Sequence, residues 1–445
     1  MRYDMTEGPM AKKLIFFALP MILGDILQQL YNVADTAIVG RFVGKTALAA
    51  VGSSFSIMAF AISVVTGMCM GAGVVFGQCF GARDPGRLAR SAKFSFFLIL
   101  GVTVGLSVLA VVFCPQILHL FQMPQDTRPI AQSYLQITFG GLLFTFLYNY
   151  CACLLRSVGN SRAPLYFLAA AGAINVLLDL LFVAHFGMGA AGAAWATVIA
   201  QFCSAVGCCL YCYRQQVIPK GEVYDSGAPV GGTVLSNSLL TALQQSVLNF
   251  GMVLVQGLVN SYGVTVMASF AAASKIHSFA SLPATDFGNA FSTFVAQNSG
   301  AKKPQRIKQG LRTCLFILLG FSLVVAAVIL LFSRQMIGIF IDAGDVQAIS
   351  IGADYLHVEA YFYFFMCVQC LFYGFYRGLS MQRTTVVLSV ASLGTRTLLS
   401  YLLAATAMSF TGIYWAVPIG WMVANCVGVI IYRRSRWGDR LLAGT

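Results

Sequence analysis

Twelve apolar segments, each long enough to cross a bilayer as a helix, make up most of this sequence. A transmembrane helix needs about 20 mostly apolar residues, and backbone exposed to lipid must satisfy its own hydrogen bonds. We therefore predict an all-α polytopic membrane protein with twelve transmembrane helices. The predicted spans are 14–39, 50–79, 93–114, 131–155, 164–185, 190–212, 234–258, 264–292, 311–333, 354–376, 385–408 and 411–432.

The composition excludes the main alternatives to a membrane protein. Charged residues are 10% of the 445 positions and hydrophobic residues are 58%, whereas soluble domains carry about a quarter charged residues. A secreted disulfide scaffold, a disordered chain and a simple soluble enzyme are therefore disfavoured. The first 13 residues lack the pattern of a cleaved signal peptide.

Basic residues are distributed very unequally between the two sides of the predicted membrane. Of 28 Lys and Arg, 22 fall on one side, four on the other, and Lys275 and Arg396 inside spans. This is the asymmetry of the positive-inside rule, so we expect a plasma-membrane protein with both termini in the cytoplasm. Orientation and anionic lipid explain the net charge of +13 without nucleic acid as a partner. We expect a monomer.

The two halves of the chain repeat each other. Phe76–Pro85 matches Val295–Pro304 at a shift of 219 residues, and Trp195 matches Trp415 at 220. Each copy contains six spans, an even number, so both enter the membrane in the same orientation. This predicts two six-helix bundles related by a parallel repeat, with a pseudo-two-fold axis along the membrane normal. The predicted domains are an N-lobe at 1–213, a cytoplasmic linker at 214–232 and a C-lobe at 233–445.

Two acidic residues are predicted at the same depth in the first bundle. Asp35 and Asp179 each lie six residues from the outer end of a span, which is about 9 Å at 1.5 Å per residue. Asn175 shares a helix face with Asp179, and Thr197 falls in the same layer. Such oxygen atoms suit a hard monovalent cation, and a desolvated carboxyl pair also suits a proton. Na⁺ and H⁺ therefore both remain open, and the alternative is hydrogen bonding between helices alone.

The second bundle carries a different set of polar residues within its spans. Lys275, Asp286 and Arg396 either pair with one another to hold the bundle together or face a cavity and contact a substrate. Gln245 and Asn249 lie on one face of span 234–258, and the same two interpretations apply to them.

Other motifs are interpreted as structural. The pairs Cys209/Cys212 and Cys367/Cys370 have zinc-knuckle spacing but lie among apolar residues, so we expect packed thiols, without zinc and without disulfides. The segments 40–46 and 71–77 fail the spacing of nucleotide-binding loops. The four histidines form no metal cluster and no catalytic arrangement is evident. We therefore expect a protein that is not an enzyme and has no cofactor.

Several segments together resemble the multidrug and toxic compound extrusion (MATE) family over about residues 10–435. They are Val33–Gly40, the paired segments Gln78–Ala82 and Gln297–Ala301, Leu155–Asn160, Asn175–Asp179 and Gly192–Thr197. The resemblance implies alternating access and export of amphipathic, often cationic small molecules, coupled to inward Na⁺ or H⁺.

The resemblance also implies functional residues. It places the coupling-ion site at Asp35, Asn175, Asp179 and Thr197, and it puts Tyr134 and Asn149 near that site. The full set of candidate substrate contacts is Tyr31, Tyr134, Asn149, Gln245, Asn249, Lys275, Asp286 and Arg396.

Three other functions compete with multidrug antiport. One is export of a specific metabolite, and another is a flippase for a lipid-linked precursor. The flippase needs a strongly basic cavity, for which only Lys275 and Arg396 are available. A membrane-embedded enzyme or a channel is the third, but the enzyme lacks a metal-binding set and a channel does not need a two-bundle repeat.

Overall fold

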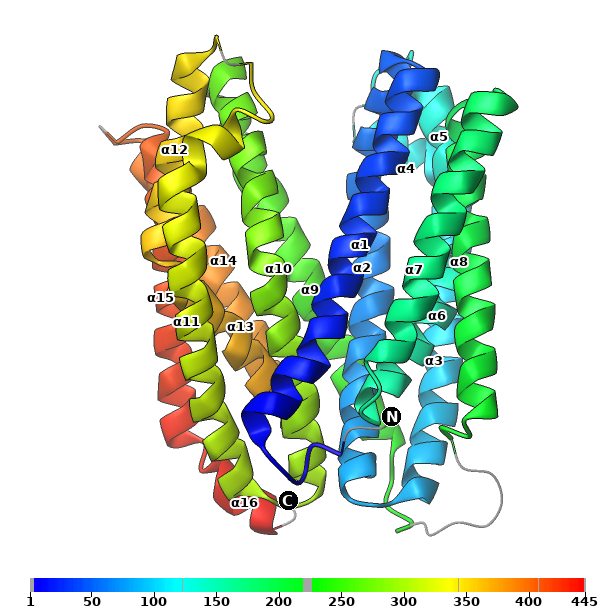
Figure 1. The fold of residues 1–445 in the computed structure, drawn as a ribbon, viewed down its shortest axis with the longest axis vertical. Coiled ribbons are helices and arrows are strands. Elements are labelled where there is room, and N and C mark those ends of the chain that lie inside the picture. The colour runs from blue at the N-terminus through cyan, green and yellow to red at the C-terminus, as the bar shows by residue number, and fades with distance from the viewer. Residues whose placement is uncertain (1–3, 122, 219–225, 343, 407, 444–445) are drawn as a thin grey trace. The chain divides into compact units, whose positions relative to one another are not determined.

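The computed structural model describes residues 4–121, 123–218, 226–342, 344–406 and 408–443, and every regular element in this part of the chain is helical (Figure 1). The predicted all-α class is confirmed. In the first half the helices are α1 (Met10–Phe42), α2 (Lys45–Gly81), α3 (Pro85–Val112), α4 (Cys114–Leu120), α5 (Arg128–Gly140), α6 (Leu142–Ser157), α7 (Arg162–Asp179), the π-helix η1 (Leu180–His185) and α8 (Gly189–Arg214).

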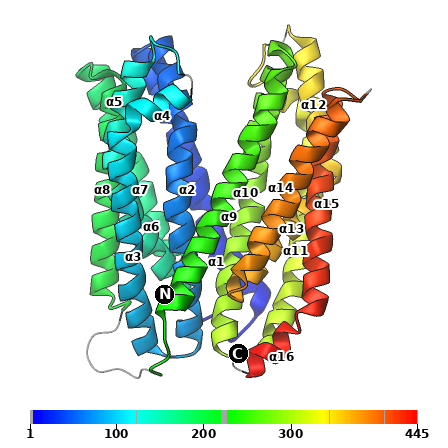
Figure 2. The ribbon, with the colours of Figure 1, turned by 180° about the vertical axis from the view of Figure 1, so that it is seen from behind.

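The second half has the same succession of long helices. They are α9 (Gly231–Asn260), α10 (Val264–Gly300), α11 (Pro304–Ile337), α12 (Val346–Tyr361), α13 (Tyr363–Gly378), α14 (Gln382–Ala404), α15 (Thr411–Arg434) and the short α16 (Trp437–Ala443). Helix α8 packs against α5, α6 and α7, and helix α10 packs against α11, α12 and α13 (Figures 1 and 2).

The twelve predicted spans correspond to these elements. Among the described residues, eight helices are long and apolar enough to cross a membrane, and two bent pairs, α5–α6 and α12–α13, bring the number to ten. Helices α1 and α10 complete the twelve with 33 and 37 residues, although both carry polar and charged side chains. The predicted spans 93–114 and 385–408 extend slightly beyond α3 and α14, which end at Val112 and Ala404.

The bends in two of the spans were not predicted. The α5–α6 pair bends by 43° around Gly141, and the α12–α13 pair bends by 59° around Phe362. A Cβ atom at Gly141 would collide with Val198 of α8. Glycine therefore lets the bent segment approach α8 closely.

Left-handed backbone conformations repeat along the chain with the shift found in the sequence. Gly44 and Gly263 (φ 109° and 89°) and Arg83 and Lys302 (φ 56° and 54°) are separated by 219 residues. The pairs Gly159/Ser380, Gly189/Ser409 and Gln216/Arg436 are separated by 221, 220 and 220 residues. Because positive φ is uncommon outside glycine, ten such residues in five matched pairs show that the repeat extends to the helix ends and turns.

The turn between the second and third long helices of each half holds a chain segment that precedes a first helix. At the α2–α3 turn, Asp84 Oδ2 accepts from Ser226 N (3.2 Å) and Arg90 Nη2 donates to Ala228 O (3.1 Å). At the α10–α11 turn, Arg306 Nη2 donates to Glu7 O (2.7 Å) and Lys303 Nζ donates to Thr6 O (3.0 Å). The matched motifs 76–85 and 295–304 thus sit where each half holds the segment leading into the first helix of the other half.

The helices α1 and α9 each belong to two compact units. The first unit contains Leu19–Ala242, whereas Met5–Ala18 belong with the second unit, which resumes at Leu243. Within the first unit, the start of α9 packs so closely on α2 that a Cβ at Gly67 would lie 2.6 Å from Ala242 Cα. The edges of these units differ from the predicted lobe boundaries at 213 and 233. Part of the predicted linker, 219–225, lies outside the described residues.

Candidate cation site

Asp35 and Asp179 lie together in the first compact unit. Asp35 is on α1 and is half-buried, whereas Asp179 is the last residue of α7 and is fully buried. Their carboxyl groups are within hydrogen-bonding reach of each other. Helices α1 and α7 can meet because small residues separate them. Gly24 of α1 faces Leu168, and Gly172 of α7 would place a Cβ 3.2 Å from the ring of Tyr31.

Asn175 and Thr197 join α7 to α8 beside the acidic pair. The amide Nδ2 of Asn175 donates to Thr197 Oγ1 at 3.4 Å, and the hydroxyl of Thr197 donates to Ala193 O at 3.0 Å. Asn175 precedes Asp179 by four residues and therefore lies on the same face of α7. The oxygen atom of Thr197 keeps acceptor capacity after these two bonds.

The site contains buried acceptors that have no donor. Oδ1 of Asp35, Oδ1 of Asn175 and both carboxylate oxygens of Asp179 accept no hydrogen bond from the described part of the protein. No salt bridge within the described residues joins Asp35 or Asp179 to Lys or Arg. Buried acceptors are normally satisfied, and a buried carboxylate is costly unless a positive charge or a proton compensates it. These oxygen atoms therefore need a positive partner that the described chain does not supply.

Aromatic and amide side chains border the acidic pair. Tyr134 of α5 lies near both Asp35 and Asp179, and Tyr31 lies between Asp35 and the amide of Gln201. Asn149 of α6 is different because its amide donates to Thr145 O of its own helix at 2.8 Å, and no printed contact joins it to the acids. The structure thus brings Tyr31 and Tyr134 to the four oxygen-bearing residues but gives Asn149 a local partner.

The backbone changes its helical type directly after Asp179. Residues Leu180–His185 form a π-helix, in which Phe186 N donates to Leu181 O at 2.9 Å. Such wider turns are frequent at functional sites. Nothing in the apolar sequence of this segment indicated it.

In the second compact unit, Asp286 is part of a buried polar network. Asn289 Nδ2 lies 3.5 Å from Asp286 Oδ1, and Arg377 Nη1 donates to Asn289 Oδ1 at 2.9 Å. Arg377 Nη2 also donates to Gln244 Oε1 at 3.3 Å. Arg377, which the charge count assigned to a loop, is only 5% exposed at the end of α13. Its match to Arg156 of the first half gave no indication of this burial.

The other candidate residues of the second bundle are dispersed. Lys275 is exposed on α10, eleven residues before Asp286, which is about 16 Å along a helix, so the two do not pair directly. Gln245 and Asn249 are half-buried on α9. Arg396 of α14 lies near Glu359 and Tyr355.

A buried ion pair in the second unit was missed by the sequence analysis. His277 Nδ1 of α10 lies 2.9 Å from Glu359 Oε2 of α12, and Tyr355 donates to Glu359 Oε1 at 2.7 Å. Glu359 is 2% exposed. An acid and a histidine in two predicted spans were the available signal, but the sequence does not show that the two helix faces meet.

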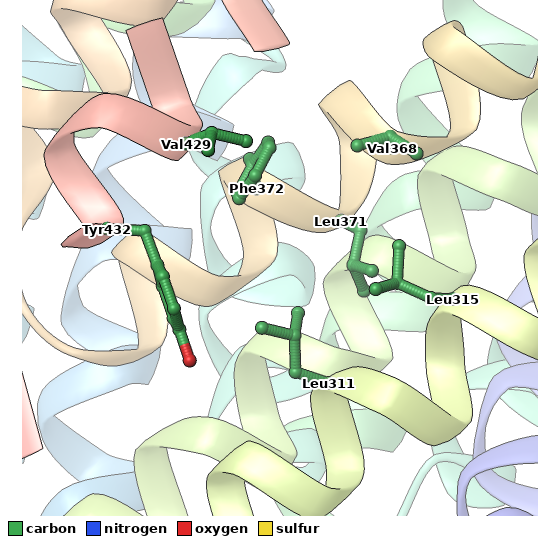
Figure 3. A pocket seen from close by; sticks show the side chains of 7 residues that line it. All are labelled: Leu311, Leu315, Val368, Leu371, Phe372, Val429 and Tyr432. Atoms are coloured by element: carbon green, nitrogen blue, oxygen red, sulfur yellow. The ribbon is translucent and has the colours of Figure 1, made fainter. Parts of the chain in front are cut away.

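The second unit also contains an apolar hollow among α11, α13 and α15 (Figure 3). Its lining residues are Leu311, Leu315, Val368, Leu371, Phe372, Val429 and Tyr432. This lining offers no carboxylate or amide, so the hollow is unsuited to a cation.

The fold and the buried oxygen cluster define a class, a multi-pass membrane protein built from a repeated helical bundle with intramembrane acids. The family model described as MatE matches residues 20–203 and 241–402, one segment in each half. The chain belongs to the MatE family. It is thus a membrane transporter and not an enzyme.

Characterised relatives match nearly the whole chain. The probable multidrug resistance protein YpnP of Bacillus subtilis is 29% identical over 435 residues, which cover 98% of this chain and 97% of that protein. The multidrug export protein MepA of Staphylococcus aureus is 20% identical over 454 residues, covering 100% of this chain and 97% of that protein.

Solved structures share the fold. One, described as the outward-facing conformation of a multidrug resistance MATE family transporter of the MOP superfamily, has a TM-score of 0.90, 20% identity and coverage of 99% and 98% of the two chains. A MOP superfamily transporter from Pyrococcus furiosus has a TM-score of 0.88, 21% identity and 98% coverage of both, and its binding-pocket polarity is described as suggesting a different function.

Proposed function

We propose that this transporter exports amphipathic, often cationic small molecules by antiport against Na⁺ or H⁺, using Asp35, Asn175, Asp179 and Thr197 to bind the coupling ion. The observation that carries the proposal is the set of four buried acceptor atoms without donors at a pair of acids without a basic partner. The descriptions of YpnP and MepA as multidrug proteins support the substrate class.

The coupling chemistry follows from the oxygen atoms. Two carboxylates, an amide oxygen and a hydroxyl oxygen can replace the hydration shell of Na⁺. Alternatively, a proton can join two carboxyl groups that repel each other when both are ionised. A conformation that binds the ion more tightly becomes favoured when the ion binds. Antiport requires that this conformation bind the exported molecule less tightly.

The setting in the cell is part of the same proposal. The transporter works as a monomer in the plasma membrane, with both termini and the basic loops on the cytoplasmic side. Molecules are taken from the cytoplasm or the bilayer and released outside.

The test is ethidium efflux from cells that lack their own efflux pumps, with external Na⁺ and pH varied independently. We expect efflux to follow one of the two ions, and Asp179→Asn and Asp35→Asn to reduce it at least tenfold at unchanged protein level. Asp126→Asn, which changes an exposed acid in a loop of the same unit, is the control and should leave efflux unchanged. Efflux that ignores both ions, or that survives both variants, would overturn the proposal.

A further inference from the structure

Four of the 13 cysteines converge in the first compact unit. Cys151 lies on α6, and Cys208, Cys209 and Cys212 lie on α8, which packs against α6. Cys208 and Cys212 are four residues apart and share one face of α8. The spacing of Cys209 and Cys212 alone indicated packed thiols, but the sequence did not show that Cys151 joins them.

The sulfur atoms are close enough to bind one ion. The Sγ atoms of Cys151, Cys208 and Cys212 all lie within 4.8 Å of one another, and Cys151 Sγ is 3.4 Å from Cys209 Sγ. Tetrahedral zinc with Zn–S bonds of about 2.3 Å needs sulfur atoms about 3.8 Å apart. Small side-chain rotations within the existing helix pair would therefore complete a sulfur coordination shell.

Burial and chemistry distinguish this cluster from the carboxylate site. Cys151, Cys208 and Cys212 are 6%, 0% and 9% exposed. Cys208 follows Thr197 by eleven residues on α8, a distance of about 16 Å along the helix. Carboxylate, amide and hydroxyl oxygens suit hard cations, whereas thiolates select soft ions. The two sites would therefore not compete for the same ion.

We propose that Cys151, Cys208 and Cys212 form a binding site for a soft divalent d¹⁰ metal ion such as Zn²⁺ or Cd²⁺, with Cys209 available as a fourth ligand. The thiols lose their protons when the metal binds. Three thiolates around a divalent ion leave one net negative charge, which costs less in an apolar interior than the two left by a monovalent ion. The bound ion ties α6 to α8.

The position of the cluster gives the ion a route. Cys212 lies two residues before Arg214, and Cys151 lies five residues before Arg156, near the basic ends of both helices. The charge distribution predicts that these ends face the cytoplasm. Cys209 is half-buried, so the cluster has a partly open edge toward which an ion can approach.

The test uses the purified full-length protein in detergent, titrated with Cd²⁺. We expect one Cd²⁺ per chain, a thiolate-to-cadmium charge-transfer band in the ultraviolet, and a higher Tm. With Zn²⁺, X-ray absorption should show sulfur neighbours at about 2.3 Å.

Two sets of variants decide the assignment. Cys151→Ser/Cys208→Ser/Cys212→Ser should weaken Cd²⁺ binding at least tenfold and abolish the charge-transfer band. The matched control Cys203→Ser/Cys314→Ser/Cys426→Ser, which changes three cysteines outside the cluster, should keep both. The single variant Cys151→Ser removes the only α6 ligand and serves if the triple variant fails to fold. Unchanged binding in a cluster variant that folds, or an equal loss in the control, would overturn the proposal.

Discussion

The side-chain amide of Asn175 donates a hydrogen bond to Thr197 Oγ1 across 3.4 Å, while the carbonyl oxygen of the same amide accepts none from the described residues. The hydroxyl proton of Thr197 is committed to Ala193 O at 3.0 Å. The two side chains thus present oxygen lone pairs, not protons, beside Asp35 and Asp179. This arrangement favours a positive ion in the site.

Thr197→Val tests whether the hydroxyl oxygen is a ligand. Valine keeps the size and branching of the side chain and removes one neutral ligand worth about 1 kcal/mol. We expect the half-saturating concentration of the coupling ion for efflux to rise about fivefold. Thr313→Val, which removes a hydroxyl bonded to Gln309 O in the same i to i−4 manner, is the control. An unchanged ion dependence in Thr197→Val would show that Thr197 is not a ligand.

Gly71→Ala tests the close contact between α2 and the beginning of α9. A Cβ atom at Gly71 would collide with Asn237 O and lie 2.7 Å from Ser238 Cα. Overpacking of this kind costs about 1–3 kcal/mol, whereas alanine in a helix otherwise gains about 1 kcal/mol over glycine. We expect Gly71→Ala to lower Tm. Gly101→Ala on α3, where nothing lies within 4 Å, should leave Tm unchanged or raise it.

The fold could be predicted because the bilayer leaves the chain few options. Spans of about 20 apolar residues and the asymmetry of Lys and Arg fix the number and direction of the helices, and the matched motifs revealed the repeat. The bends at Gly141 and Phe362 could not be predicted, since each lies within an unbroken apolar run. Their cause is tertiary packing, as the contact between Gly141 and Val198 shows.

The candidate site was partly accessible because depth can be counted from loops. Six residues from a helix end placed Asp35 and Asp179 in one layer, and the structure brings them together. The direction in which a helix face points is set by packing and cannot be counted in this way. For that reason the His277–Glu359 pair and the meeting of Cys151 with Cys208 and Cys212 were not found from the sequence.

Glu359→Gln tests the buried ion pair of the second unit. The variant leaves His277 without its acidic partner and weakens the bond from Tyr355. Breaking a buried pair by removing one charge costs about 3 kcal/mol, so Tm should fall clearly. The double variant His277→Asn/Glu359→Gln should be less destabilised than the sum of the single variants, because neither charge remains unpaired. Additive losses would mean that the two side chains do not act as a pair.

Asp84→Ala tests the turn that holds the segment before α9. Asp84 Oδ1 caps α3 by accepting from Arg87 N at 2.8 Å, and Oδ2 accepts from Ser226 N at 3.2 Å. Although burial raises the pKa of this carboxyl, the hydrogen bonds from Ser226 and Arg87 and the charge of Arg87 lower the pKa below its ordinary value. Loss of the cap alone should cost about 1 kcal/mol.

The lowered pKa of Asp84 also fixes the pH dependence of this loss. The carboxylate stabilises the native state, so its contribution is complete above the unfolded pKa of about 3.9 and disappears as the pH falls through the lower native pKa. The Tm difference between wild type and Asp84→Ala should therefore be constant from about pH 5 to 7 and shrink below about pH 4. Asp345→Ala removes the cap of α12 at Ala348 N and should leave proteolysis of the 214–232 segment unchanged, whereas Asp84→Ala should accelerate it. Equal proteolysis in the two variants would show that Asp84 acts only as a helix cap.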